Sequence, residues 1–404
     1  MDKEKLNKKK EKKDTRTSFV ITMGILIILL IVLIYIYVHY YFLGGRAKSY
    51  ISRGKPVACL FLGLDDSEKN KKADTIIIGI YNPPTKRMGI IFIPRDLRLK
   101  VPTNLGIKQE KASVILTRYG LKKMVKVIED FLHMDIPYHA TMDIEGLIKI
   151  IDLLGSVEIF VDKPMKYIDQ AAGLYIDIPR GIMKVDGLQV MKFIRFRDDE
   201  RGDIGRIDRQ FELMINVIQK GILGKNILTD IKFIKLILRY IDTNINFRDL
   251  ISLLRDTSEA DFKNIEMIRI PGKFIKVYGV DYIEPDEQKT KKIVIDFFKT
   301  LNKLKGQCIP SEIKVQVLNG SGKSGVARSA RDKLVRNGFN VVEFGNADSQ
   351  NYQNTIILDR SGNIQKSQAV SRILQCDKIY PKINYFILVD VTVIVGKDYK
   401  NILR

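Results

Sequence analysis

Apolar residues follow two spacings along this chain, and each spacing predicts one kind of secondary structure. Runs rich in β-branched residues between polar or turn-forming residues predict strands. Such runs are found at 56–65, 75–81, 88–93, 157–161 and 174–178. Apolar residues three and four positions apart predict amphipathic helices, and this spacing is found at 121–132 and 144–154. Residues 186–193 are predicted as a helix or as a helix that leads into a strand. Because strands and helices alternate, we predict an α/β fold, a sheet with helices packed on it.

The residues between 75–81 and 88–93 predict a β-hairpin. They are rich in asparagine, proline and lysine, which is the composition of a turn. The second strand is followed by Pro94, which cannot donate a ladder hydrogen bond and therefore ends the strand. Asp74 and Arg95 are then expected at strand ends, on the same hairpin.

The rest of the chain divides into two parts. Residues 223–306 have mainly helical spacing with one strand-like stretch at 265–270, so we expect a helical extension and connector. Strands and helices alternate again over 312–400, which predicts a small α/β domain. The loop at 319–325 lies between a strand and a helix, as a P-loop does. A P-loop would need its first glycine at position 317, however, and this chain has Val317 there. The sequence therefore favours an ordinary turn.

The N-terminal residues predict a membrane anchor. Residues 19–42 are apolar over about the length needed to cross a bilayer, and the tail at 1–18 is rich in lysine. The positive-inside rule places this tail in the cytoplasm and the chain after Gly45 outside. A cleaved signal peptide is the alternative, but the apolar run is long for one and its nearest cleavage site is interrupted by Arg46. We expect a single-pass cell-membrane protein with a large external domain.

Composition narrows the class of partner. The net charge of +21 over 404 residues favours polyanions, which include nucleic acid, acidic lipid headgroups and phosphorylated glycans. Because an external domain meets neither chromosomal DNA nor ATP, wall polymers and lipid-linked sugars remain, and we expect no nucleic-acid partner. Three cysteines without paired spacing predict neither a disulfide framework nor a thiolate metal site. Three scattered histidines do not supply a zinc site or a catalytic triad.

Arginines alternate with carboxylates in the segment after the helix predicted at 186–193. If the chain is extended up to Arg197, Arg195 and Arg197 share one face. Arg206, Arg209 and Gln210 have helical spacing and also share a face. Planar guanidinium groups bind phosphate oxygens in pairs, so the two groups are expected to converge on one anion. A solvated, salt-bridged loop is the alternative for such a segment taken alone.

Several short motifs occur along the chain in a set order. They are Leu62-Gly63-Leu64-Asp65, Ala73-Asp74-Thr75, Ile93-Pro94-Arg95-Asp96 and the arginine-rich segment 195–210. This ordered set resembles the signature of the LytR-CpsA-Psr family over roughly 57–221, and residues 312–400 look like the LytR C-terminal domain of some members. The chain departs from the family pattern at Ala73, where members often have serine, and at Asp198, where they often have histidine. Neither departure removes an expected ligand.

The resemblance implies the fold of that family, a mixed β-sheet flanked by helices. It also implies an extracytoplasmic enzyme that acts as a glycopolymer phosphotransferase. Such an enzyme moves a glycopolymer from a polyprenyl-pyrophosphate carrier to the cell wall and forms a phosphodiester bond. A pyrophosphatase side activity is also expected. The acceptor is expected to be peptidoglycan or another wall molecule. Two alternatives are a membrane-bound transcriptional attenuator, for which the inner tail is too short to fold, and a non-catalytic protein that binds wall polymer.

The resemblance also implies site residues. Mg²⁺ would be held by Asp65 and Asp74, although Asp66 is an alternative to its neighbour. The pyrophosphate would be bound by Arg95, Arg195, Arg197, Arg206 and Gln210. Guanidinium groups and a hard cation suit this task, because they neutralise a diphosphate before a sugar hydroxyl approaches phosphorus. The polyprenyl chain would need an apolar pocket, whose lining has the same sequence pattern as a core.

The remaining charged residues of the motifs have expected roles too. The catalytic group would consist of Arg95, Arg197, Asp199 and Asp203. In it, Asp199 or Asp203 would accept the proton of the attacking hydroxyl or would orient the arginines. Arg201 and Arg209 are either further anion ligands or structural braces. Asp96 is expected to pair with a neighbouring arginine.

Overall fold

The computed structural model describes residues 30–31, 45–65, 72–170, 173–196, 205, 208–210, 212–217, 231–260, 265–303, 309–383 and 388–402. The expected tail at 1–18 and nearly all of the expected span at 19–42 lie outside these residues. Among the residues that are described, no helix has both the length and the apolar character required to cross a membrane.

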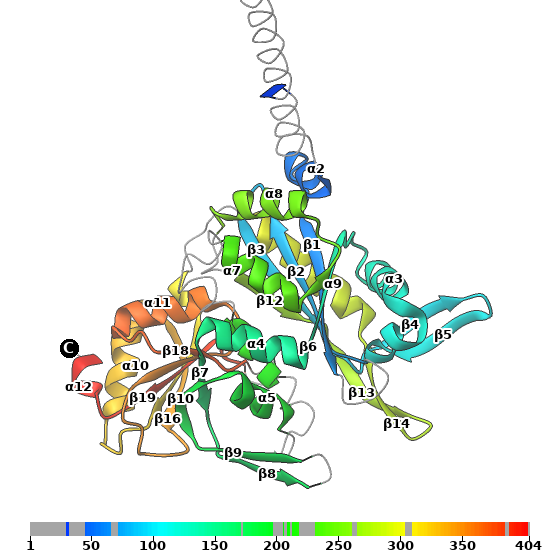
Figure 1. Ribbon diagram of the computed structural model, residues 1–404. Coiled ribbons are helices and arrows are strands. Elements are labelled where there is room, and N and C mark those ends of the chain that lie inside the picture. The colour runs from blue at the N-terminus through cyan, green and yellow to red at the C-terminus, as the bar shows by residue number, and fades with distance from the viewer. Residues whose placement is uncertain are drawn as a thin grey trace, which may run out of the picture.

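The described residues form two units, a larger one between 45 and 303 and a C-terminal one between 309 and 402. A six-stranded mixed sheet forms the centre of the larger unit (Figure 1). Its strands, in spatial order, are β11 (Asp242–Thr243), β6 (Tyr138–Asp143), β1 (Val57–Asp65), β2 (Lys72–Asn82), β3 (Arg87–Ile93) and β12 (Ile265–Arg269). The three central strands are antiparallel to one another, whereas β6 and β12 run parallel to their neighbours. The predicted hairpin and the predicted mixed sheet are both confirmed.

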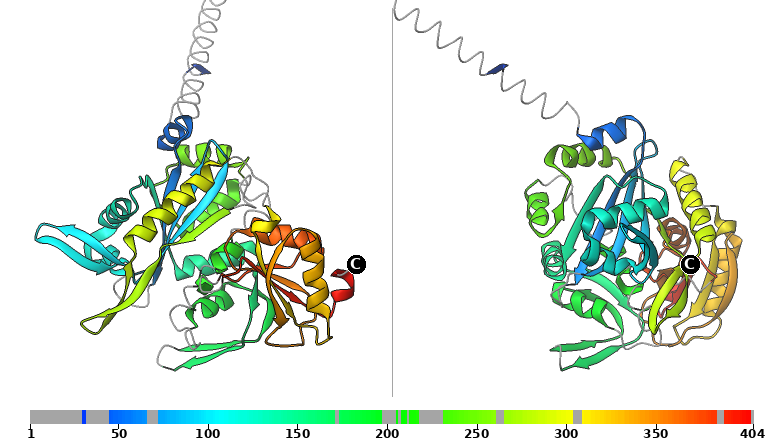
Figure 2. Two further views of the ribbon diagram at one scale, coloured as in Figure 1. Left: turned by 180° about the vertical axis from the view of Figure 1, so that it is seen from behind. Right: turned by 90° about the vertical axis from the view of Figure 1, so that its right-hand side faces the viewer.

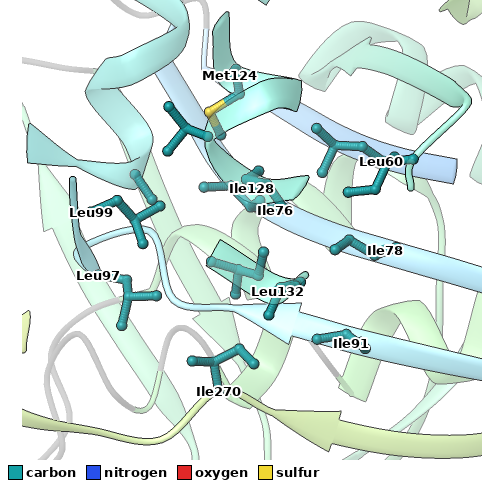
Figure 3. Close-up of a cluster of buried hydrophobic side chains, with 14 of the residues drawn as sticks. Leu60, Ile76, Ile78, Ile91, Leu97, Leu99, Met124, Ile128, Leu132 and Ile270 are labelled. Carbon is teal, nitrogen blue, oxygen red and sulfur yellow. The ribbon is translucent and has the colours of Figure 1, made fainter. Parts of the chain in front are cut away.

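One face of the sheet packs against α3 (Ala112–Leu132) and α9 (Glu287–Asn302). Figure 3 shows Met124, Ile128 and Leu132 of α3 over the strand residues Leu60, Ile76, Ile78 and Ile91. Seen from behind in Figure 2, α9 crosses this face. The predicted helix at 121–132 is therefore confirmed, but α3 begins earlier and bends at Gly120, whose backbone has a φ of 78°.

Helices on the other face leave a space against the sheet that becomes the functional site. Near this face lie α4 (Ile144–Leu154), α5 (Gly187–Arg195), α7 (Ile231–Ile237), the 3₁₀ turn η2 (Leu238–Tyr240) and the helical residues 212–217. Asp143 caps α4 by accepting a hydrogen bond from the Gly146 amide, and Gly155 ends it in the left-handed conformation. Both ends of α4 agree with the predicted helix.

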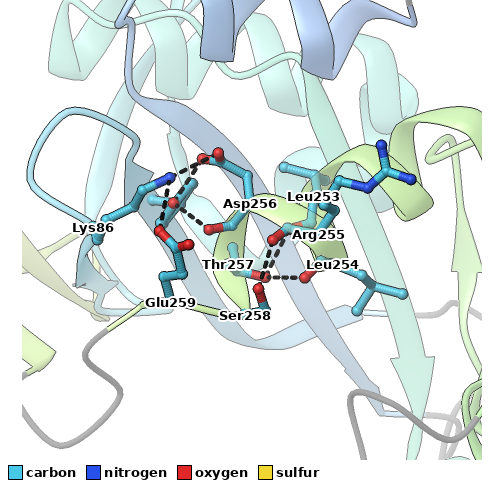
Figure 4. Close-up of polar contacts among 9 residues, drawn as sticks. Lys86, Leu253, Leu254, Arg255, Asp256, Thr257, Ser258 and Glu259 are labelled. Atoms are coloured by element: carbon cyan, nitrogen blue, oxygen red, sulfur yellow. Dashed lines mark hydrogen bonds and ion pairs between the residues drawn. The ribbon is translucent and has the colours of Figure 1, made fainter. Parts of the chain in front are cut away.

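Two further helices lie together at the N-terminal end of the larger unit. They are α2 (Arg46–Ser52) and α8 (Phe247–Thr257), which are side by side in Figure 1. The C-terminal end of α8 is tied to the β2–β3 hairpin, because Lys86 Nζ lies 2.7 Å from Asp256 Oδ1 (Figure 4). The Tyr81 hydroxyl donates to the same carboxylate at 2.7 Å.

Residues 223–306 differ from the expected helical connector. Their described part supplies β11 and β12, so this segment completes both edges of the central sheet. It also forms a hairpin of β13 (Gly272–Val277) and β14 (Val280–Pro285). Three more strand pairs border the larger unit: β4 (Arg98–Thr103) with β5 (Gly106–Lys111), β8 (Met165–Asp169) with β9 (Leu174–Ile178), and β7 (Val157–Val161) with β10 (Gly181–Val185).

The C-terminal unit is a second α/β layer structure, as expected, and is drawn in orange and red in Figure 1. Its sheet, in spatial order, consists of β16 (Asn340–Asn346), β15 (Lys314–Asn319), β19 (Val391–Val395), β17 (Ile356–Asp359) and β18 (Ile379–Pro381). Two helices, α10 (Val326–Arg336) and α11 (Ile364–Leu374), pack on it. The short helices η3 (Pro310–Glu312) and α12 (Tyr399–Ile402) lie near its ends.

The glycine-rich loop after β15 is a strand-to-helix turn. The Asn319 side chain accepts hydrogen bonds from the Ser321 amide and hydroxyl, and it donates to the Lys323 carbonyl at 2.9 Å. The loop therefore closes on its own backbone, as the sequence favoured.

Candidate functional site

A cavity of about 700 Å³ lies against the sheet face opposite α3 and α9. Its floor consists of strand residues that alternate with those of the core: Cys59, Phe61, Gly63, Ile77, Gly79 and Ile90. Its walls come from α4, from the hairpin β8–β9, and from Leu213, Met214 and Val217. The cavity is therefore an apolar chamber between the sheet and its helices.

Polar side chains line the cavity where β1 ends and β2 begins. Asp65 is the last residue of β1, and Asp74 and Thr75 lie near the start of the neighbouring strand β2, where Thr75 pairs with Gly63. Arg195, from the end of α5, and Gln210 also line the cavity. The cavity thus combines an apolar body with a charged group of residues at the sheet edge.

The charged group contains two carboxylate–guanidinium pairs. Arg95 Nη1 lies 2.8 Å from Asp74 Oδ1, and Arg195 Nη2 lies 3.8 Å from Asp65 Oδ1. The Thr75 hydroxyl donates to Gln210 Oε1 at 3.4 Å. The structure therefore brings together five predicted site residues, which come from four separate stretches of sequence.

Arg95 is held from two sides. Its Nε lies 3.4 Å from Asp96 Oδ2, and Lys111 Nζ lies 2.8 Å from the other oxygen of the same carboxylate. Asp96 is thus a bridge between two cations, and its predicted pairing with an arginine is confirmed. Because one guanidinium contacts Asp74 and Asp96 together, its direction toward the cavity edge is fixed.

The backbone at Arg195 differs from the expected extended strand. Asp186 and Gln189 form a capping box that starts α5, and the helix continues to Arg195. Arg195 therefore ends a helix, and the extended backbone assumed for it is wrong at this residue. The apolar residues at 193, 194 and 196 fit either spacing. The part of the prediction that concerns Arg197 lies outside the described residues.

Arg209 is a brace and does not line the cavity. Its side chain is buried and donates to the Phe196 carbonyl, and its guanidinium lies 5.2 Å from the centre of the Phe196 ring. This contact joins the helix at 208–210 to the end of α5. Of the two roles that the sequence left open for Arg209, the structure supports the structural one.

Four predicted residues lie outside the described part of the chain. They are Arg197, Asp199, Asp203 and Arg206, and Arg201 and Asp66 lie outside it as well. The predictions for their roles therefore stay predictions.

Sequence reasoning missed two polar residues of the cavity. Thr75 was part of a motif but was given no role, and Asp143 was not considered, although both line the cavity. Asp143 ends β6, which pairs in parallel with β1 so that Asp143 lies opposite Leu64. Because parallel strands end at the same edge of a sheet, this strand end was the available signal.

The thiol of Cys59 on the cavity floor is too weakly ionised to be a catalytic nucleophile. Burial raises the pKa of its thiol to about 12, so the thiol stays protonated at neutral pH. The chemistry of the cavity rests on oxygen and guanidinium groups.

The carboxylates fit a magnesium ion that is shared with a phosphate ligand. Within the described ranges there is no group of three or more histidine, cysteine, aspartate or glutamate side chains that could hold a metal. Asp65 and Asp74 do lie on adjacent strand ends at the cavity edge. Mg²⁺ is commonly held by one or two carboxylates with substrate phosphates and water, so this donor set suits it.

Comparison with known proteins shows the family of this chain. The model of the LytR-CpsA-Psr family (LytR_cpsA_psr) matches residues 38–298. The chain belongs to this family. A second family model, described as LytR cell envelope-related transcriptional attenuator, matches residues 312–399. The expected family and the expected C-terminal match are therefore confirmed.

Two curated members of the LytR-CpsA-Psr family from Bacillus subtilis (strain 168) are similar to this chain. Polyisoprenyl-teichoic acid–peptidoglycan teichoic acid transferase TagV is 27% identical over 250 residues, which cover 59% of this chain and 63% of TagV. TagU, which has the same transferase name, is 27% identical over 258 residues, covering 63% of this chain and 80% of TagU. The match thus spans less than two thirds of TagV.

A solved structure supports the fold. The crystal structure of B. subtilis TagV aligns with a TM-score of 0.54 at 24% identity, covering 62% of this chain and 99% of that chain. The larger unit therefore has the LytR-CpsA-Psr fold.

Proposed function

We propose that this chain transfers a glycopolymer from a polyprenyl-pyrophosphate carrier to a cell-wall acceptor, forming a phosphodiester bond. The observation that carries the proposal is the cavity itself, in which an apolar chamber adjoins two aspartates and two arginines. An isoprenoid pyrophosphate has the same division between an apolar chain and a charged head. The names of TagV and TagU, which state a polyisoprenyl-linked teichoic acid and peptidoglycan, support this substrate class.

The proposed reaction moves one phosphorus centre. An acceptor hydroxyl attacks the phosphorus that bears the glycan, a new P–O bond forms, and the pyrophosphate bond breaks so that polyprenyl phosphate leaves. Arg95 and Arg195 bind the phosphate oxygens, while Gln210, held by Thr75, orients the head group. The proton of the hydroxyl is expected to pass to Asp199 or Asp203.

Asp65 and Asp74 are the residues that would hold Mg²⁺. When bound, the ion would neutralise charge on the pyrophosphate oxygens. The chain's own contribution is to place both carboxylates at the end of the apolar chamber. Arg95 and Arg195, each close to one of these carboxylates, would keep the pair oriented.

The proposal includes an external location. The apolar run at 19–42 would anchor the chain in the membrane, with residues 1–18 in the cytoplasm. The helix α2 begins at Arg46, only a few residues after the apolar run, so the larger unit follows the expected anchor closely. The carrier lipid would be reached from the same membrane.

Substitution of Arg95 by alanine tests the proposal. We expect R95A to release polyprenyl phosphate from a polyprenyl-pyrophosphate-linked glycan about a hundredfold more slowly, because it removes one charged donor to the transferring group. The measurement uses purified full-length protein with Mg²⁺ and peptidoglycan acceptor. R98A is the matched control, since Arg98 pairs with Glu284 outside the cavity and should leave the rate within about twofold.

Two outcomes would contradict the transferase. If R95A turned over as fast as the wild type, the pyrophosphate would not be bound at this cluster. If the wild-type protein bound wall polymer but released no polyprenyl phosphate, a non-catalytic binding protein would be the better description.

A further inference from the structure

The C-terminal unit reaches the wall of the cavity through one buried cation. Lys382 follows β18, and its side chain is only 6% exposed. Its Nζ lies 3.3 Å from Glu212 Oε2 and 3.4 Å from Asp162 Oδ1, both in the larger unit. Glu212 is itself 4% exposed, so this pair is sealed from water at the contact between the units.

The backbone of Lys382 is fixed within the C-terminal unit. Its amide donates to the Asp359 carbonyl at 2.9 Å, and its carbonyl accepts from Arg360 Nη1 at 3.2 Å. The ammonium group is therefore presented from a rigid support, and it does not simply follow the position of Glu212.

Glu212 begins the stretch that forms one cavity wall. Leu213 and Met214 follow it directly and line the cavity, and Gln210 lies two residues before it. A shift of Glu212 would therefore move a ligand of the proposed pyrophosphate site and the wall of the apolar chamber together.

A second residue of the C-terminal unit supports the same wall. Ile383 is 1% exposed and packs in one cluster with Ile215 and Ile77. Ile77 belongs to the cavity floor, so the wall and the floor meet on this side chain. Lys382 and Ile383 thus hold residues 212–215 by a polar and an apolar contact.

The ion pair between Lys382 and Glu212 is better suited to fixing the position of residues 212–215 than to stabilising the whole fold. Removing two charges from water costs free energy that their attraction often only balances, so a buried pair more readily specifies one arrangement. Burial raises the pKa of the Glu212 carboxyl to about 7, against the opposing effect of Lys382. The ammonium can donate a hydrogen bond to this group in either protonation state.

We propose that Lys382 is a positioning residue that acts through Glu212, fixing residues 210–217 so that Gln210 and the apolar wall face the lipid pyrophosphate. The C-terminal unit is then part of the catalytic apparatus without contacting substrate. The identity of the ligand in this inference rests on the proposed function. The contacts of Lys382 with Glu212 are independent of that function.

A different contact between the units supplies a matched control. Arg180, in the turn between β9 and β10, donates to Asp348 at 3.0 Å and to the Tyr352 hydroxyl at 2.6 Å. This contact joins the same two units but does not involve residues 210–217. Its loss reports on general attachment of the C-terminal unit, whereas loss of Lys382 reports on the cavity wall.

The test compares K382M, K382R and R180A in the full-length chain. The probe is geranylgeranyl pyrophosphate, which has both a charged head and an apolar chain, and its affinity is measured by calorimetry with Mg²⁺ present. We expect K382M to bind at least about tenfold more weakly, K382R to stay within about threefold, and R180A to match the wild type. Thermal unfolding confirms that each variant is folded.

Alkylation of Cys59 gives a second readout that needs no ligand. Cys59 lies on the cavity floor and is largely buried. Its rate of modification, followed by mass spectrometry of its peptide, should rise several-fold in K382M and stay unchanged in R180A. A folded K382M with wild-type affinity and wild-type alkylation would overturn the inference, as would an equal loss in R180A.

The two proposals can fail separately. If the wild-type chain does not bind the probe, the proposed function fails, while the alkylation rates still decide the role of Lys382. If K382M does not fold, E212A takes its place, because it removes the acceptor of the Lys382 ammonium, and it is expected to change both readouts in the same direction. A folded E212A protein identical to the wild type in both readouts would overturn the inference.

Discussion

At the scale of single residues, Gly79 determines how deep the cavity is. It lies in β2 on the cavity floor, and a Cβ atom added there would meet no other atom within 4 Å. We expect G79L to fold and to fill part of the chamber, displacing about three methylene groups of a bound lipid. At about 0.8 kcal/mol per methylene, affinity for geranylgeranyl pyrophosphate should fall roughly thirtyfold or more, as measured by calorimetry.

Two controls separate the lipid chain from its head group. G79A adds one carbon and should bind nearly as well as the wild type. Inorganic pyrophosphate should bind equally to the wild type and to G79L, because the charged group of residues is unchanged. Undiminished lipid affinity in G79L would show that the apolar chain lies elsewhere.

Glu212 predicts a dependence of stability on pH. Its pKa is raised from 4.5 to about 7 in the folded chain by burial, so the folded state holds the proton more tightly than the unfolded state. The stabilising effect of this proton is complete below about pH 4.5 and is lost as the pH rises through 7. Relative to E212Q, the wild type should lose about 3 kcal/mol of unfolding free energy between about pH 4 and pH 8.

Urea unfolding of both proteins across this range makes the comparison. The difference between them isolates this one carboxyl from the other titrating groups. A difference that stays constant with pH would mean that Glu212 keeps an ordinary pKa and that burial does not penalise its charged form.

Single residues of the site were predictable where a motif supplied them. Asp65, Asp74 and Gln210 line the cavity and Arg95 contacts Asp74, and these positions could be picked out because strand ends and short motifs are local features. Arg195 was predicted as a site residue, but on an extended backbone and not at the end of a helix. The apolar chamber could not be located at all, since a residue such as Phe61 has the same sequence signal whether it faces a cavity or a core.

At the scale of elements, α2 is capped by another helix. Its N-cap residue Gly45 has no side chain, and Asp249 of α8 accepts a hydrogen bond from the Ala47 amide at 2.8 Å. A Cβ at residue 45 would collide with this carboxylate, so the close approach requires glycine. The cap thus fixes the first helix of the larger unit to α8.

Removal of this cap should destabilise the larger unit. We expect D249A to lower the free energy of unfolding by about 2 kcal/mol, because it leaves the buried Ala47 amide without its acceptor. Urea denaturation measures the change. R255A, an exposed position in the last turn of the same helix, should stay within about 0.5 kcal/mol of the wild type. An equal effect of both substitutions would count against the cap.

Elements whose apolar residues have a regular spacing were predicted well, and elements without such a spacing were missed. The strands β1, β3 and β7 and the helix α4 agree with their sequence patterns. The start of α3 was missed, because Gly120 interrupts the helix and only the residues after it keep a clear apolar stripe. β11 is two residues long and has no period of its own to detect.

At the scale of the whole molecule, sequence patterns did not reveal which distant segments meet. Residues 223–306 were expected as a connector, yet β11 and β12 take the two outer positions of the central sheet. The pairing of β12 with β3 joins segments far apart in the chain, which local spacing cannot encode. Lys382 and Glu212 likewise resemble ordinary surface charges until both units are folded.

The outer position of β12 has a consequence for biosynthesis. While the polypeptide is being made, β3 has no neighbour on its far side until Arg269 has left the ribosome. During that interval the exposed edge of β3 can pair with other nascent chains. The edge is covered only when β12, which is far away in the sequence, pairs with it. A product truncated shortly before Ile265 should therefore aggregate, whereas one ending after β12 has a complete sheet.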